Sequence, residues 1–166
     1  AAMCDARNVS QSVLESYESI QINAATVLVS KESKELISKY DVSMNTAEVM
    51  EAPKNVEVMV QNGKYEISSN TVLSNPVILV VNGSLDINTD SQEVLEKFVS
   101  ILVNGSLSYS SDIKDKLPMI KVNGSTDCYP SDAVRLKSTF IMDKTFIMRA
   151  KNGKYYARNK VVIPDE

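Results

Sequence analysis

Every glycine in this sequence is preceded by asparagine, and this pairing limits what the chain can fold into more than any other feature. The five glycines of the 166 residues lie in segments that resemble one another: MVQNGKYEI, LVVNGSLDI, ILVNGSLSY, IKVNGSTDC and RAKNGKYYA. Two earlier segments, QINAATVLV and VSMNTAEVM, are degenerate copies without the glycine. Recurrence of one motif along a chain indicates a tandem-repeat architecture.

The spacing of the motif suggests a unit of strand and short helix. The asparagines are 17 to 22 residues apart until the last step, which is 29, and a period near 20 is typical of leucine-rich repeats. Helix-like connectors are expected between them at residues 33–40, 91–99, 110–117 and 131–136, with a further helix at 9–17. The repeated asparagines are Asn23, Asn45, Asn62, Asn82, Asn104, Asn123 and Asn152.

The core segments resemble the leucine-rich-repeat family. LPMIKV at 117–122 and FVSILV at 98–103 echo its L-x-x-L-x-L pattern, and the resemblance covers residues 20–130. It implies an α/β fold, a short right-handed β/α solenoid. In that family the asparagine follows the last core aliphatic by three positions, whereas Asn104 directly follows Val103, so the role of that asparagine is not carried over. The units also resemble uncharacterised bacterial repeat proteins with VNGSL-type units, which implies no function.

One repeat domain, residues 1–166, accommodates these elements. We expect an N-terminal helical cap at 1–19, repeats at 20–130 and a C-terminal cap at 131–166 that contains a β-hairpin at Asn152. Solenoids need such caps to cover the ends of their cores. The C-terminal segment could instead form a basic and aromatic contact surface. Its residues for that purpose are Lys151, Lys154, Tyr155, Tyr156, Arg158 and Lys160.

A second fold interpretation stays open. Asn-Gly between alternating apolar residues is a strong signal for a two-residue hairpin turn. In VEVMVQNGKYEI such a turn would pair Val60 with Tyr65 and Val58 with Ile67. The alternative is therefore an α+β fold made of successive Asn-Gly β-hairpins.

Strand alternation sorts the middle repeats into an apolar and a polar face. Parallel stacking would align the polar residues in rows that either hydrogen-bond along themselves, as stacked amide ladders do, or form an open surface for a partner. We name this possible partner-binding surface the polar face. Its rows are Asn82, Asn104 and Asn123; Ser84, Ser106 and Ser125; and Asp86, Ser108 and Asp127.

Composition removes several function classes. The chain has no histidine, which is the commonest general base and metal ligand, and its two cysteines, Cys4 and Cys128, are far apart. Asp86 and Asp127 are the one imaginable acid/base pair, and nothing in the sequence would perturb them. We therefore expect no catalytic residues, no cofactor and no metal.

The charge pattern bears on partners and location. The net charge is −3 without a basic cluster, which disfavours nucleic acid, and no apolar run is long enough to span a membrane. The sequence best fits a non-enzymatic repeat module for protein–protein interaction or scaffolding, with an unknown partner protein. The alternative is a cell-surface adhesin or glycan-binding module. A cytoplasmic location is favoured over the cell surface, and the oligomeric state is left open.

Overall fold

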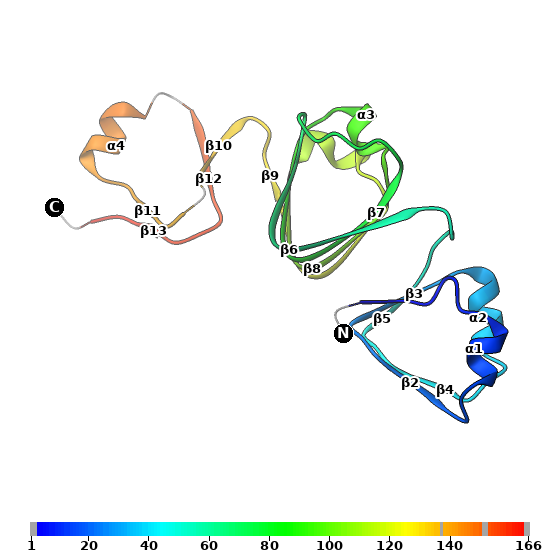
Figure 1. The fold of residues 1–166 in the computed structure, drawn as a ribbon. Coiled ribbons are helices and arrows are strands. Elements are labelled where there is room, and N and C mark those ends of the chain that lie inside the picture. The colour runs from blue at the N-terminus through cyan, green and yellow to red at the C-terminus, as the bar shows by residue number, and fades with distance from the viewer. Residues whose placement is uncertain (1–2, 137, 151–152, 165–166) are drawn as a thin grey trace. The chain divides into compact units, whose positions relative to one another are not determined.

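The computed structural model describes residues 3–136, 138–150 and 153–164. Strands make up 49% of it and helices 18% (Figure 1). The chain divides into two compact units, Ala1–Val56 and Glu57–Glu166, which are described separately. Every strand pairing in the described residues is parallel.

The first unit contains two small parallel sheets. One has the order β1-β3-β5, and in it Thr26 lies opposite both Met3 and Glu48. The other pairs β2 with β4 and places Asn23 opposite Asn45. The elements are β1 Met3–Asp5, α1 Gln11–Glu15, β2 Ile20–Asn23, β3 Thr26–Val29, α2 Lys31–Ile37, β4 Val42–Asn45 and β5 Glu48–Glu51.

Arg7 links the beginning and the end of this unit. Its guanidinium is buried and forms an ion pair with Asp5, with Nη2 2.8 Å from Oδ2. Nη1 donates to the carbonyl oxygens of Pro53 at 2.6 Å and of Val56 at 2.7 Å. One side chain thus satisfies a carboxylate and two backbone acceptors that are about fifty residues further along the chain.

The second unit begins with four long strands stacked in the order β6-β7-β8-β9. They run in parallel register, so that the four asparagines Asn62, Asn82, Asn104 and Asn123 lie next to one another. Figure 1 shows these strands lying over one another. The elements are β6 Glu57–Ser68, β7 Val77–Asn88, α3 Gln92–Leu95, β8 Phe98–Ser110, the 3₁₀ helix η1 Ser111–Lys116 and β9 Ile120–Tyr129.

The core of this stack comes from alternate strand residues. Leu79, Val81, Leu85 and Ile87 of β7 are almost completely buried. Their register partners on β8 continue the same rows, and the short helices α3 and η1 each add a buried aliphatic side chain. The other members of the cluster are Ile67, Val77, Leu95, Phe98, Ile101, Val103, Leu107, Tyr109 and Ile113.

A row of glycines lets the strands approach one another. A Cβ atom added to Gly105 would lie 1.9 Å from the carbonyl oxygen of Gly83, and one added to Gly83 would lie 2.0 Å from that of Gly63. Gly105 also has φ of +148°, a conformation that L residues rarely adopt. The repeat needs glycine here because the backbone of the preceding strand occupies the place of a side chain.

The last part of the second unit forms two short parallel pairs. β10 Ala133–Leu136 pairs with β12 Lys154–Ala157, and β11 Phe140–Ile141 pairs with β13 Val161–Val162. Helix α4, Lys144–Arg149, lies between β11 and β12. Phe146 from this helix stacks edge-on against Phe140 and Tyr155, with ring centroids 4.4 and 5.1 Å apart.

The expected right-handed β/α solenoid of leucine-rich-repeat type is wrong, because the structure has mostly strands in small open parallel sheets. Strands of 10 to 13 residues fill much of each period in β6 to β9. The described helices have only four to seven residues, and none is long and apolar enough to cross a membrane. The connectors therefore add single anchoring side chains to the core and do not form a helical layer.

The hairpin alternative is also wrong. Asn62 and Gly63 lie in the middle of β6, where Val60 neighbours Val80 and not Tyr65. Residues 131–136, expected to be helical, contain strand β10, and the helix expected at 9–17 covers only Gln11–Glu15. The expected turn at Asn152 lies outside the described residues; after it, Tyr155 is paired in parallel with Val134.

The glycine row predicts a graded response to alanine. Gly105→Ala would place its Cβ atom against the carbonyl oxygen of Gly83. The Cβ atom of Gly63→Ala would have no other atom within 4 Å, so this variant would cost only backbone strain, about 1–3 kcal/mol. We expect Gly105→Ala to lower the free energy of unfolding clearly more than Gly63→Ala does, as measured by urea denaturation. Equal losses at the two positions would contradict the close approach of the strands.

Candidate functional site

The asparagine row of the polar face is a continuous hydrogen-bonded ladder. Asn82 Nδ2 donates to Asn62 Oδ1 at 3.0 Å, Asn104 Nδ2 to Asn82 Oδ1 at 2.9 Å, and Asn123 Nδ2 to Asn104 Oδ1 at 3.0 Å. The register expected for this row is confirmed, and Asn62 extends it by one strand. Within the row, each amide therefore satisfies its neighbour.

The serine row lies beside the ladder, and its side chains have fewer described hydrogen bonds than the asparagines have. Ser84, Ser106 and Ser125 lie in register, and Lys64 takes the corresponding position on β6. Ser125 accepts a hydrogen bond from Arg158 Nη2 at 2.7 Å. Ser84 and Ser106 are half-buried. Their hydroxyl groups lie between the asparagine ladder and the third row.

The third row is acidic and buried. Asp86, Ser108 and Asp127 are in register and only 8%, 7% and 3% exposed. Glu66 of β6 adds an exposed carboxylate opposite Asp86. Buried carboxylates are unfavourable unless they are paired, so this row requires a cation.

Arg135 from β10 supplies that cation. Its Nη1 donates to both carboxylate oxygens of Asp86 at 3.0 Å, and its Nη2 donates to the hydroxyl of Ser108. The same Nη2 lies 3.5 Å from Asp127 Oδ2. The planar guanidinium suits this task because it presents several donors in a fixed fork.

Two tyrosines complete the contact. The ring of Tyr129 lies under the guanidinium of Arg135, with the Arg135 Cζ atom 4.6 Å from the ring centroid. The hydroxyl of Tyr156, on β12, donates a hydrogen bond to Asp127 Oδ1. The hydrogen bond to Asp127 is the main cause that raises the pKa of Tyr156, and burial is the second. Burial is the main cause that raises the pKa of Tyr129, and the negative charge of Asp86 is the second.

The structure therefore divides the predicted site into two parts. The chain's own C-terminal segment occupies the row Asp86, Ser108 and Asp127, and it reaches Ser125. The remaining positions, Asn82, Ser84, Asn104, Ser106 and Asn123, are not contacted by that segment among the bonds described above. Tyr156 and Arg158 belonged to the alternative contact surface expected from the sequence, and Arg135 was missed. An acidic row without a visible counter-ion was the signal that could have suggested a cation.

In this site, buried carboxylates bind the guanidinium of Arg135 and the phenol of Tyr156. Asp86 and Asp127, considered above as an acid/base pair, both accept hydrogen bonds from the C-terminal segment. In the described residues no group of three or more Cys, Asp or Glu side chains could hold a metal ion. Cys4 and Cys128 are free thiols.

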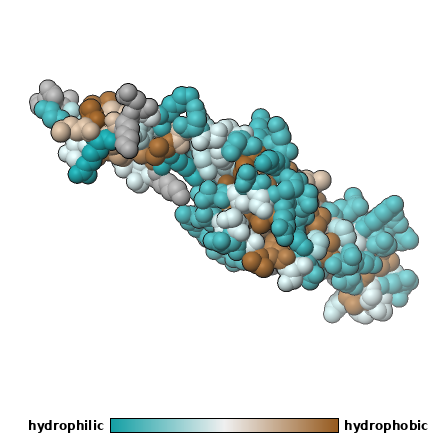
Figure 2. All heavy atoms as spheres, turned by 90° about the horizontal axis from the view of Figure 1, so that it is seen from above, coloured by the Kyte–Doolittle hydropathy of each residue, from teal (hydrophilic) through white to brown (hydrophobic). Residues whose placement is uncertain are grey.

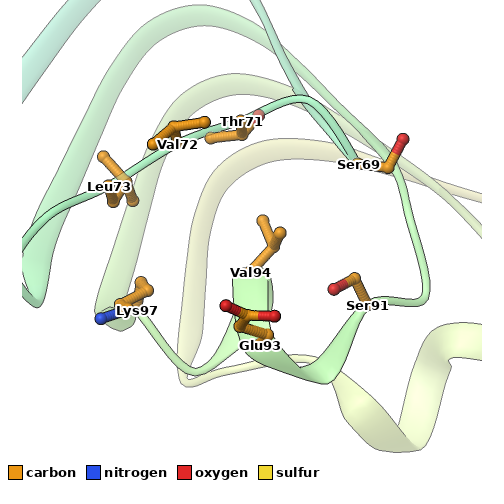
Figure 3. Close-up of a pocket in the computed structure, with 8 residues that line it drawn as sticks. All are labelled: Ser69, Thr71, Val72, Leu73, Ser91, Glu93, Val94 and Lys97. Carbon is orange, nitrogen blue, oxygen red and sulfur yellow. The ribbon is translucent and has the colours of Figure 1, made fainter.

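A shallow pocket of about 220 Å³ lies elsewhere in the second unit, between α3 and the connection from β6 to β7. Figure 3 shows Val94 pointing from α3 toward this connection, with Glu93 and Ser91 at the rim. None of the residues of the polar face lines it. The remaining lining residues are Ser69, Thr71, Val72, Leu73 and Lys97.

Comparison with known proteins adds no assignment. No family model matches the chain, and neither a curated protein nor a solved structure is detectably similar to it.

The buried acidic row predicts a large effect at Arg135. Arg135→Met would leave Asp86 and Asp127 without their cation, and we expect a loss of about 3 kcal/mol in the free energy of unfolding. Adding Asp86→Asn to this variant should restore part of the loss. Lys154→Met is the matched control, because it removes an exposed ion pair with Asp132 and should change stability little. Equal effects at Arg135 and Lys154 would refute the role of the buried row.

The hydrogen bond between Tyr156 and Asp127 predicts a pH effect. Because the folded pKa of Tyr156 is raised, the bond stabilises the fold below the unfolded pKa of about 10. That stabilisation is lost as pH rises through the folded value. An ultraviolet titration of tyrosinate, as the difference between wild type and Tyr156→Phe, should show Tyr156 ionising late. In Asp127→Asn it should ionise closer to the ordinary value; an unchanged curve would contradict the assignment.

Proposed function

We propose that this chain is a non-enzymatic module for protein–protein interaction or scaffolding. The observation that supports this most directly is the register of the polar face. Four strands align asparagines in one row, and β7, β8 and β9 align serines in the next. The asparagine ladder ties neighbouring strands to each other through side chains. Such a surface is preorganised, so a partner does not have to order it on binding.

The part of the face offered to a partner is the serine row with the adjoining ladder. Ser84 and Ser106 are half-buried hydroxyl groups, each able to donate one hydrogen bond and accept two. They recur at the spacing of neighbouring strands, about 4.8 Å. A polypeptide with polar groups at a similar spacing fits this surface better than a single small ligand.

The chain itself supports a polypeptide partner. β10 and β12 bring Arg135 and Tyr156 onto the acidic row, which is an example of extended protein segments held by this face. The contact uses a guanidinium and a phenol, the side-chain types enriched in protein interfaces. A partner segment of the same chemistry would continue this mode of binding across the serine row.

The test is affinity capture with charge added to the serine row. In Ser84→Glu with Ser106→Glu, capture of a specific protein from native lysate should fall about tenfold or more, because unpaired charge at an interface is costly. The matched control, Ser69→Glu with Asn70→Glu, adds the same charge on the exposed connection after β6 and should leave capture unchanged.

Two results would overturn the proposal. Equal capture by both double variants would remove the polar face as the binding surface. Binding to a glycan array without capture of any protein would favour the adhesin or glycan-binding alternative.

A further inference from the structure

Within the described part of the second unit, each outer strand of the four-stranded stack has a neighbouring strand on one side only. Among the described residues β6 pairs only with β7, and β9 pairs only with β8. A free edge of a parallel sheet presents unpaired backbone donors and acceptors, which favour pairing with another strand. The two edges are different surfaces, and three observations show that they are complementary.

The first observation concerns Gly63. Gly83, Gly105 and Gly124 are each required because a carbonyl oxygen of the preceding strand lies within 2.0 Å of where a Cβ would be. Gly63 has the same Asn-Gly sequence and φ of +91°, yet nothing lies within 4 Å of its Cβ position. The space beside Gly63 matches the space that a stacked carbonyl fills at the other three glycines.

The second observation concerns the direction of the asparagine ladder. Each amide nitrogen donates toward β6, so the ladder begins at Asn62 Nδ2 and ends at Asn123 Oδ1. At the β6 end an amide donor is exposed, and at the β9 end an amide acceptor is exposed. A donor end and an acceptor end can join without reversing the ladder.

The third observation concerns the ends of the core. On β8, Val103 and Leu107 are buried, but their register partners on β9, Val122 and Thr126, are half-buried and exposed. On β6, Met59 and Tyr65 are only partly buried although they pack against the core. In the surface view of the chain, hydrophobic residues are visible among hydrophilic ones (Figure 2). Both ends thus leave apolar area that a further strand would cover.

We propose that a second copy of this chain stacks its β6 edge on the β9 edge of the first, in parallel and in register. Asn62 of the second copy would then donate to Asn123 of the first, and the Gly124 carbonyl would fill the space beside Gly63. Such a contact joins two different surfaces, so it can repeat from copy to copy, in an open chain or a closed ring. This inference is independent of the partner proposed for the polar face.

The charges at the edges are compatible with this contact. In the stacked register Glu66 of the second copy would lie opposite Asp127, as Glu66 already lies opposite Asp86 within the chain. Lys64 would lie opposite Ser125, as it already lies opposite Ser84. The new contact therefore repeats neighbours found within the chain, with Arg158 as an additional cation beside Ser125.

The experiment is sedimentation velocity of the full chain over a concentration series. Wild type should associate, with an average mass that at least doubles. Gly63→Asn fills the space at the β6 edge, and Thr126→Lys places a charge at the β9 edge; each should remain monomeric. Asparagine is chosen because it tolerates positive φ better than most residues. Val99→Lys is the control: it places the same charge on an inner strand and should associate as wild type does.

Mixing the two blocked variants gives the decisive result. Gly63→Asn keeps an intact β9 edge and Thr126→Lys keeps an intact β6 edge, so together they should form a one-to-one dimer that grows no further. A wild type that stays monomeric would overturn the proposal. So would association of the Gly63→Asn variant alone and of the Thr126→Lys variant alone, or a mixture of the two variants that stays monomeric. If Gly63→Asn lowers the melting temperature, Asn62→Lys at the same edge replaces it.

Discussion

The close approach of successive backbones at the glycine row is the constraint on which the second unit depends. A carbonyl oxygen occupies the space of a missing side chain at Gly83, Gly105 and Gly124, so the observed register is one in which a glycine faces each of these carbonyls. That register then aligns every other position. The close approach at the glycines adds to the hydrophobic pattern and the connections, which also set the register of a sheet.

Alignment has a benefit and a cost. It lets the asparagines satisfy each other along the stack, as in stacked amide ladders. It also gathers Asp86 and Asp127 into one buried row, which is unfavourable unless a cation neutralises it. Arg135 and Tyr156 come from β10 and β12 to meet this row. The C-terminal segment is thus tied to the stack by the electrostatics that the register creates.

Sequence reasoning predicted the rows but not the fold around them. Asparagine, serine and acidic rows follow from strand alternation and repeat spacing, and the structure aligns them. The β/α solenoid failed because a period near 20 does not say how many residues are strand. Residues 131–136 were expected to be helical, although Val134 and Leu136 are two apart and so share a face of a strand, and β10 is a strand. Arg135 was missed with it, since a contact 49 residues from Asp86 leaves no local pattern.

The glycine row also determines which changes of length the chain can absorb. Neighbouring glycines of the row are 20, 22 and 19 residues apart. The differences are taken up in the connections and at a register shift early in β8, where Phe98 and Ser100 lie opposite Val77 and Ile78. Insertion of one residue next to a glycine, where no such shift absorbs it, would instead move that glycine out of its row and bring a side chain against a carbonyl. Duplication or loss of a whole unit keeps every glycine in place. The gene for such a protein can therefore change by whole repeats far more easily than by single codons next to a glycine.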